Sequence, residues 1–204
     1  MGRPPRFTEE GILDAALSVA SSRGKQATVD EVATVLDARV GSIYYRYPSR
    51  ESLFGALWVR SVRRFQAVFL GALAHPDPRT GLIHAAATIP DYCRAHPDEA
   101  VALTLYRHRA LLIACPPNLY DDVAGLNVEL LGMLAQVAAG LGATEADLPM
   151  ITAATQLVPY GLVRPYLGTP DGIPEWATPA ARAAAAAILD LIPWHEGRVA
   201  AADH

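Results

Sequence analysis

The sequence predicts an all-α protein in which a small N-terminal domain with a helix-turn-helix precedes a larger helical domain. Apolar residues recur at helical spacing between clear helix ends, and no segment shows the alternating pattern of a half-buried strand. A third observation is the stretch at residues 28–54, where two short amphipathic helices flank a tight turn. With 204 residues, the chain is long enough for both domains.

The first predicted helix follows a short basic arm, MGRPPR at residues 1–6, which has no packing pattern. Thr8 and the two acidic residues after it are typical of a helix start, because negative charge is favourable at a helix N-terminus. Gly24 is predicted to end this helix. We expect the helix to complete the core on which the next two helices rest. Its apolar stripe comprises Ile12, Leu13, Ala16, Leu17 and Ala20.

The second predicted helix begins at Thr28, three residues before Glu31. This spacing predicts a capping box, in which the Thr28 side chain caps the helix and Glu31 reaches back to the Thr28 N–H. The apolar stripe that follows ends before Asp37, a residue type that tolerates the left-handed conformation of a tight helix corner. The stripe comprises Val29, Val32, Ala33 and Leu36.

The third predicted helix, residues 38–47, has few apolar anchors and an outer face suited to contact. Arginine and serine can bond to base edges or phosphate, and Gly41 would let the backbone approach a groove floor. Pro48 ends this helix, and Ser49 can cap the next one. Arg50 then lies in a first helical turn, where a cation opposes the helix dipole, so we expect an external anion such as a DNA phosphate. The alternative is a solvated helical hairpin with incidental charge.

The N-terminal domain resembles that of the TetR family of bacterial transcriptional regulators in the stretch ATVDEVATVLDARVGSIYYRYPSRESLFGALW. The shared features are a threonine-led second helix, the Gly-Ser-Ile-Tyr-Tyr core of the third, an aromatic residue at position 47 and Ser-Arg-Glu-x-Leu at the start of the fourth. The resemblance covers roughly residues 7–58. It implies a homodimer that binds a palindromic operator in double-stranded DNA and leaves it when a small hydrophobic effector enters the C-terminal domain.

The resemblance also assigns candidate DNA contacts by position. The residues implied to face the major groove are Arg39, Val40, Gly41, Ser42 and Tyr44, and those implied to touch phosphates are Thr28, Tyr45, Arg46 and Arg50. The sequence departs from the family pattern at four positions. The family usually has glycine where this chain has Asp37, a small hydroxyl residue where it has Arg39, phenylalanine where it has Tyr47 and lysine where it has Arg50. The departure at Arg39 changes base reading, because a guanidinium reaches farther than a hydroxyl and prefers guanine through a bidentate pair.

The distribution of charge supports a division of labour along the chain. Residues 1–65 hold ten basic and seven acidic side chains, a net charge of +3, whereas residues 66–204 hold seven and fourteen, a net charge of −7. A basic head on an acidic body is typical of a DNA-binding domain fused to a domain that does not bind DNA. We therefore predict a helix-turn-helix domain at residues 1–54 and a ligand-binding and dimerisation domain at residues 55–204.

The C-terminal domain is predicted to be helical throughout, because proline and glycine residues separate segments with helical spacing. The long helix at 49–75 links the two domains, and Pro90, Pro159 and Pro165 are expected to interrupt or kink the helices that contain them. Asp147 and Thr178 are predicted caps. The predicted helices cover residues 49–75, 82–87, 97–114, 118–141, 148–166 and 178–193.

The last predicted helix is rich in alanine between Ala180 and Ile192. Small side chains allow a partner helix to approach closely. Paired with the helix at 148–166, it could form a four-helix interface between two copies, which is where the resembling family dimerises. The alternative is an internal packing helix.

Several polar or aromatic residues stand among apolar ones in the C-terminal domain. Cavities for small molecules are mostly apolar with a few converging polar groups. The candidate effector contacts are His84, Tyr92, Tyr106, His108, Asn127, Gln156 and Tyr160.

Other classes of function find little support in the sequence. It holds no nucleophile elbow, phosphate loop or zinc-protease motif, so we expect no catalytic residues and no enzyme. Cys93 and Cys115 lack metal-ligand spacing, so no metal site and no cofactor are expected. No apolar run approaches the length of a membrane span and no signal segment is evident, which favours a cytoplasmic protein without a membrane partner. The alternative function is a constitutive DNA-binding protein without a small-molecule ligand.

Overall fold

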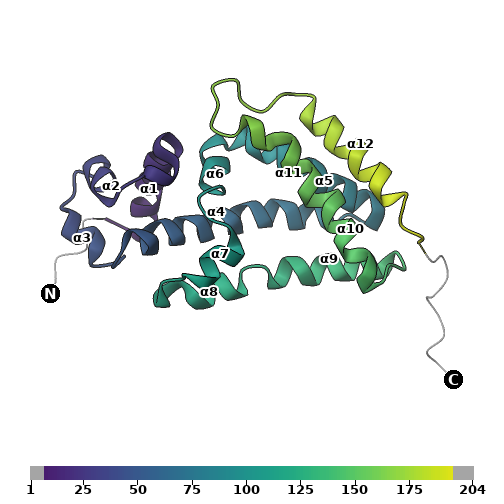
Figure 1. Ribbon diagram of the computed structural model, residues 1–204, viewed down its shortest axis with the longest axis horizontal. Coiled ribbons are helices and arrows are strands. Elements are labelled where there is room, and N and C mark those ends of the chain that lie inside the picture. Colours follow the sequence, from purple (N-terminus) through teal and green to yellow (C-terminus); the bar gives the residue numbers. More distant parts are fainter. Residues whose placement is uncertain (1–6, 195–204) are drawn as a thin grey trace. The chain divides into compact units, whose positions relative to one another are not determined.

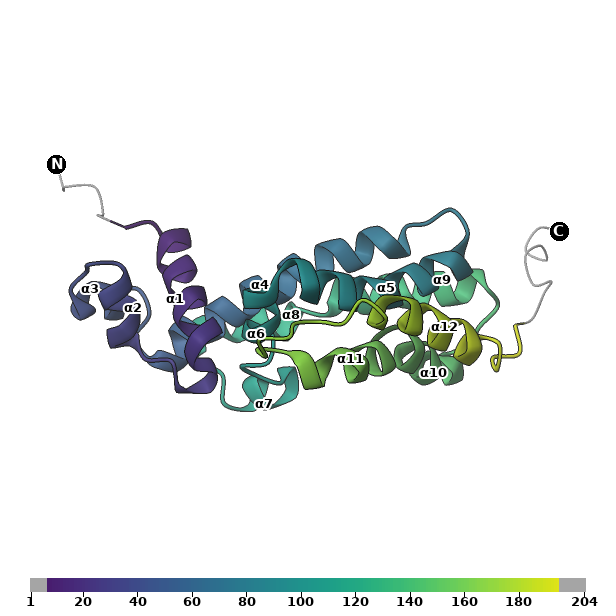
Figure 2. The same cartoon turned by 90° about the horizontal axis from the view of Figure 1, so that it is seen from above.

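The computed structural model describes residues 7–194, and these residues form helices joined by turns, without a β-strand (Figures 1 and 2). The all-α prediction is confirmed. The chain divides into two compact units, one built from Met1–Arg63 and His96–Leu126 and the other from Arg64–Ala95 and Asn127–His204. The predicted basic arm at residues 1–6 lies outside the described residues.

The first unit begins with α1 (Glu9–Arg23), which has the predicted ends. The Thr8 hydroxyl oxygen accepts a hydrogen bond from the Gly11 N–H at 3.1 Å, and Gly24 ends the helix with a positive φ of 55°. These two residues act through their own backbone neighbourhood, which is why the sequence predicts them correctly.

The next helix, α2 (Val29–Val35), carries the predicted capping box at Thr28. The turn that follows is also as predicted, because Asp37 has a φ of 49° and is the one non-glycine residue with positive φ in the described part of the chain. The Ala38 N–H donates to the Ala33 carbonyl at 2.9 Å and closes this corner. The turn then leads into α3 (Val40–Tyr44).

The core of the first unit lies between these helices and the N-terminal half of α4 (Arg50–Leu73). Its largest fully buried side chains are Val32, Ile43, Leu53, Phe54, Leu57 and Val123. The unit is larger than the predicted N-terminal domain, because α6 (Pro97–Ala102), α7 (His108–Ile113) and α8 (Tyr120–Gly125) pack on the same core. A functional boundary at residue 54 stays a prediction.

The prediction of one helix from Pro97 to about Ala114 is wrong, because α6 ends at Ala102 and α7 begins at His108. The indole N–H of Trp58 donates to the Leu103 carbonyl at 3.1 Å. A continuing helix would use that carbonyl for its own hydrogen bond. A contact with a residue distant in sequence therefore accompanies the break.

The second unit contains the C-terminal half of α4 and a set of helices that enclose Phe69, Leu82 and Ile151. These helices are α5 (Pro78–Ala95), α9 (Val128–Gly140), α10 (Leu148–Thr152), α11 (Val158–Val163) and α12 (Ala177–Leu189). Pro90 lies inside α5 without interrupting it. The predicted interruption is therefore wrong, and the alternative, a kink at Pro90, stays a prediction.

The predicted helix from 148 to 166 continues past Pro159, because one of its turns is wider than a regular α-helical turn. Residues Ala153–Leu157 form a π-helical turn between α10 and α11, and a short 3-10 turn, Arg164–Tyr166, ends the run. Proline lacks an N–H, and its ring would clash with the carbonyl four residues earlier in a regular α-helix. The wider π turn accommodates Pro159, which is buried.

Two further predictions for helix ends need correction. The Thr178 hydroxyl donates to an Asp91 carboxylate oxygen at 2.5 Å, so it does not cap α12, which begins one residue earlier at Ala177. At the other predicted cap, Asp147 is the last residue of a capping box led by Thr144. The predicted helix from 118 to 141 is divided at Asn127.

Within residues 7–194, one stretch, Pro117–Gly140, is long and apolar enough by length and composition to cross a bilayer. It includes the division between α8 and α9 at Asn127 and the acidic residues Asp121, Asp122 and Glu129. A single apolar stretch of this kind is weak evidence for a membrane span.

Candidate nucleic-acid interface

The third helix is fixed to the first unit by few apolar contacts. Ile43 is the buried residue of α3, with 1% of its surface exposed. Tyr47 follows the helix and is buried too, and its hydroxyl donates to a Glu9 carboxylate oxygen on α1 at 3.3 Å. Burial and the nearby Glu9 charge raise the pKa of Tyr47, so its phenol stays protonated. Ile43 and Tyr47 therefore hold the helix while its outer face remains accessible.

The outer face of α3 presents most of the predicted base-reading residues. Val40 is half-buried, whereas the other four, Arg39, Gly41, Ser42 and Tyr44, are exposed. Arg39 precedes the helix at its N-cap position without making a side-chain cap. Among the predicted phosphate contacts, Tyr45 is 90% exposed and Arg46 is half-buried. The structure thus brings these predicted residues together on one short segment.

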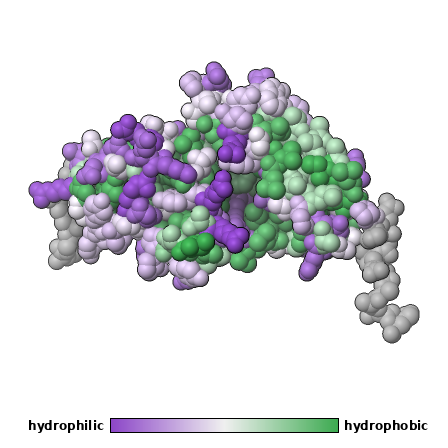
Figure 3. Space-filling view, viewed as in Figure 1, coloured by the Kyte–Doolittle hydropathy of each residue, from purple (hydrophilic) through white to green (hydrophobic). Residues whose placement is uncertain are grey.

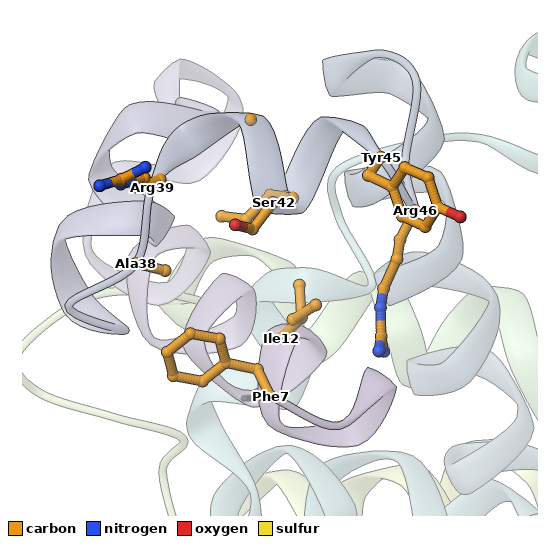
Figure 4. Close-up of a pocket in the computed structure, with 9 residues that line it drawn as sticks. Phe7, Ile12, Ala38, Arg39, Ser42, Tyr45 and Arg46 are labelled. Carbon is orange, nitrogen blue, oxygen red and sulfur yellow. The ribbon is translucent and has the colours of Figure 1, made fainter. Parts of the chain in front are cut away.

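A hollow of about 640 Å³ lies between α3 and the start of α1. Figure 4 shows Arg39 and Arg46 at opposite ends of this hollow, with Phe7 and Ile12 on its α1 side. Its lining comprises Phe7, Ile12, Ala38, Arg39, Gly41, Ser42, Ile43, Tyr45 and Arg46. Two cations flanking a partly apolar concave surface suit a ligand that carries phosphates beside flat bases. Sequence reasoning missed Phe7 and Ile12 here, because only the folded chain brings α1 beside α3.

Gly41 is not required by packing within the protein. A Cβ added at this residue would meet no atom within 4 Å, and its φ lies outside the left-handed region. Alanine would be the better helix former at this position. Packing within the described residues therefore does not call for glycine at this position.

Thr28 uses its polar groups within α2. Its hydroxyl oxygen accepts a hydrogen bond from the Glu31 N–H at 3.3 Å. Its hydroxyl and its backbone N–H both donate to Oε2 of the Glu31 carboxylate, each at 2.9 Å. Thr28 is nevertheless exposed. Its phosphate contact stays a prediction.

Arg50 is turned toward the protein, unlike Arg39, which is exposed at the N-cap of α3. Its Nε donates to the Ala27 carbonyl at 2.7 Å, and one terminal nitrogen donates to the Lys25 carbonyl at 2.6 Å. The side chain is 32% exposed. Arg50 lies in the first turn of α4, as predicted. The hydrogen-bond acceptors of its guanidinium are two backbone carbonyl oxygens of the protein.

Arg60 lies on α4 and is turned into the protein, although the charge of an arginine favours a solvated position. Only 10% of its side chain is exposed, and one terminal nitrogen lies 3.0 Å from a Glu10 oxygen and 2.8 Å from an Asp14 oxygen. The other donates to the Leu13 carbonyl at 3.2 Å. Arg60 therefore fastens α1 to α4. No local pattern could have shown this, because the partners are about fifty residues away.

The seven candidate effector contacts are divided between the two units. Tyr106 and His108 belong to the first unit, where the His108 Nε2 lies 2.7 Å from the Val123 carbonyl oxygen. In the second unit, the Asn127 side-chain oxygen accepts from Gln66 at 2.9 Å, and the Tyr92 ring packs edge-on against Phe65. The remaining three, His84, Gln156 and Tyr160, also belong to the second unit. A role in effector binding stays a prediction for each.

Comparison with known proteins gives a family match for the helix-turn-helix. Residues 12–57 match the family described as bacterial regulatory proteins, tetR family. No curated protein matches the sequence. The predicted resemblance to the TetR family is confirmed over this region.

Solved structures extend the likeness in fold to most of the chain. A transcriptional regulator from Rhodococcus sp. RHA1 has a TM-score of 0.72 at 21% sequence identity, covering 91% of this chain and 98% of that one. A TetR-like transcriptional regulator from Rhodococcus sp. RHA1 has a TM-score of 0.63 at 20% identity, covering 93% and 98%. A tetR family transcription regulator from Shewanella sp. PV-4 has a TM-score of 0.64 at 18% identity, covering 90% and 97%. At these identities the likeness shows a shared fold.

Proposed function

We propose that this chain, whose residues 12–57 belong to the TetR family, is a transcriptional regulator that binds double-stranded DNA through α3. The observation that carries the proposal is the outer face of α3, which exposes arginine, serine and tyrosine side chains while Ile43 alone is buried. Exposed polar groups on a short, supported helix suit the major groove, which admits an α-helix. The net positive charge of residues 1–65 favours the same partner.

The proposed contacts fall into two kinds. Arg39 and Ser42 read base edges, while Val40, Gly41 and Tyr44 allow close approach and apolar contact with the bases. Tyr45, Arg46 and Thr28 touch phosphates, which fix the orientation of the helix without reading sequence.

The proposal includes a homodimer on a palindromic operator. Exposed apolar residues on α10, the π turn, α11 and the segments flanking α12 support an interface between two copies, and Figure 3 shows hydrophobic residues gathered over this part of the chain. They are Met150, Leu157, Tyr160, Trp176 and Leu191. Two copies of α3 would then enter successive major grooves about 34–36 Å apart. Ala181 and Ala185, on the predicted small face of α12, are buried within the unit.

A small hydrophobic effector is proposed to release the protein from DNA, so that the protein acts as a repressor. The proposal also places the protein in the cytoplasm and gives it no catalytic activity. Binding of the effector to one conformer would lower DNA affinity by its differential affinity for the two conformers. The alternative is a constitutive DNA-binding protein. Titration of the protein–operator complex with a broad panel of hydrophobic metabolites separates the two, since release by any of them supports a repressor and release by none supports a constitutive binder.

Replacing Arg39 by alanine tests base reading. After an operator is selected from random DNA, Arg39→Ala should relax the preference at one base position in each half-site by about 1–3 kcal/mol, because a bidentate contact is lost. Arg109→Ala is the matched control, since it removes an equal charge from an exposed residue of α7. Unaltered preferences at every position in Arg39→Ala would exclude this role.

A further inference from the structure

We propose that Arg50 is a positioning residue that ties the start of α4 to the chain entering α2, and that it does not contact DNA phosphate. The inference rests on the proposed DNA-binding function. It assigns Arg50 a different part in that function from the one implied by family resemblance. Arg50 would set the placement of α2, and through the corner at Asp37 that of α3.

The two carbonyl groups that Arg50 binds lie immediately before α2. Lys25 belongs to a short 3-10 turn, Gly24–Gln26, and Ala27 follows it directly before the N-cap residue Thr28. Ala27 is fully buried, so its carbonyl lies where a hydrogen-bond partner is needed. The bonds from Arg50, at 2.7 and 2.6 Å, therefore fix the point from which α2 departs.

The geometry requires arginine. A guanidinium is a planar fork whose Nε and terminal nitrogen can donate side by side, as they do to Ala27 and Lys25. The carbon centre of the guanidinium also lies 5.0 Å from the centroid of the Phe54 ring, a distance at which a cation is attracted to an aromatic face. A lysine ammonium is a point charge on a flexible stem and cannot reproduce both carbonyl bonds in this arrangement.

These neighbours also remove the reason for expecting an external anion. A cation in the first turn of a helix opposes the helix dipole, so it needs compensation. Two carbonyl oxygens, the Phe54 ring and a Glu51 carboxylate oxygen at 3.8 Å surround the Arg50 guanidinium. The protein itself therefore supplies the compensation that the sequence argument assigned to a phosphate.

Tyr106 lies between α6 and α7 and also belongs to the first unit. The Tyr106 hydroxyl is buried, and burial raises the pKa of this phenol, while the nearby Arg50 charge acts to lower it. The printed hydrogen bonds of Arg50 join the turn before α2 to the first turn of α4.

Arg50→Lys and Arg50→Ala distinguish positioning from phosphate contact, because lysine keeps the charge and loses the fork. Operator affinity is measured at several salt concentrations, per folded molecule, with folding followed by thermal unfolding. We expect both variants to lose at least about tenfold in affinity while the slope of log K against log salt stays unchanged. Loss of a phosphate contact would reduce that slope by about 0.9. Near-normal affinity in Arg50→Lys, or a reduced slope in Arg50→Ala, would overturn the proposal.

Arg46→Ala is the control, since Arg46 is a proposed phosphate contact and its loss should reduce the salt slope by about 0.9. A wild-type protein that binds no duplex at low salt would refute the proposed function itself, separately from the role of Arg50. If the variants fail to fold, a measurement on the wild-type protein still tests the proposal. The nuclear magnetic resonance signal of the Arg50 Nε–H should keep its chemical shift when operator is added, and a large shift would contradict a purely internal role.

Discussion

The helices α2 and α3 lie on either side of one turn, yet they are stabilised in different ways. α2 has seven residues, a capping box at Thr28 and three buried side chains, Val29, Val32 and Ala33. α3 has five residues, no side-chain cap and one buried side chain, Ile43. α2 therefore satisfies its own helix start, whereas α3 depends on a single anchor and on the segments that flank it.

The difference shows how a small domain can expose a helix and still fix its orientation. Short helices are marginal in isolation, so α3 must take its stability from tertiary contacts. Asp37 sets its entry, Ile43 anchors its middle and Tyr47 secures its exit through Glu9. With support concentrated at these points, the remaining side chains of α3 are free for a partner.

The largest expected effect comes from removing the single anchor of α3. Ile43→Ala should lower the free energy of unfolding by about 2–5 kcal/mol, because it leaves a cavity in a fully packed core. Urea denaturation followed by circular dichroism measures this change. Val35→Ala on α2 is the control, since Val35 is 55% exposed and should change stability by less than about 0.5 kcal/mol. Equal effects in the two variants would erase the contrast between the helices.

A smaller effect is expected at the capping box that stabilises α2. Thr28→Ala should cost about 1 kcal/mol in unfolding free energy, because the N-cap acceptor is lost. Thr34→Ala is the control, since the Thr34 hydroxyl donates to the Asp30 carbonyl within the same helix and caps nothing. A cost in Thr28→Ala no larger than in Thr34→Ala would show that α2, like α3, is held mainly by tertiary contacts.

The same capping box predicts that the free energy of unfolding falls as the pH is lowered. Hydrogen bonds from Arg23 and then from Thr28 lower the pKa of Glu31 in the folded protein. A carboxylate with a depressed folded pKa stabilises the fold above its unfolded pKa, and this contribution is lost as the pH falls through the folded value. The loss of stability on acidification should therefore be smaller in Thr28→Ala than in the wild-type protein.

The sequence predicts those parts of the fold that depend on neighbouring residues. The cap at Thr8, the end at Gly24, the box at Thr28 and the corner at Asp37 are all correct, because each is set by groups within a few residues. The positions facing outward on α3 follow from the same local pattern. Helical spacing fixes which of its side chains can share a face.

The sequence fails where a distant partner decides the outcome. The break after α6 accompanies a bond from Trp58, and Thr178 binds Asp91 instead of capping α12. Arg60 and Arg50 both bind groups of other segments, although charge alone suggests a solvated or DNA-facing side chain. Contacts between residues far apart in sequence override local preference in each case, and a pattern within one segment carries no trace of them.

The smallest expected change in stability separates folding from DNA binding. Gly41→Ala should stabilise the protein by roughly 0.5–1 kcal/mol, since alanine favours a helix and the added Cβ meets no neighbour. The same methyl group should weaken operator binding, because it holds the α3 backbone away from the groove. Gly132→Ala in α9 is the control, where a Cβ also finds open space, so it should stabilise without changing DNA affinity. Full affinity in Gly41→Ala would mean that the backbone of α3 does not approach DNA closely, and its outer face would then need another explanation.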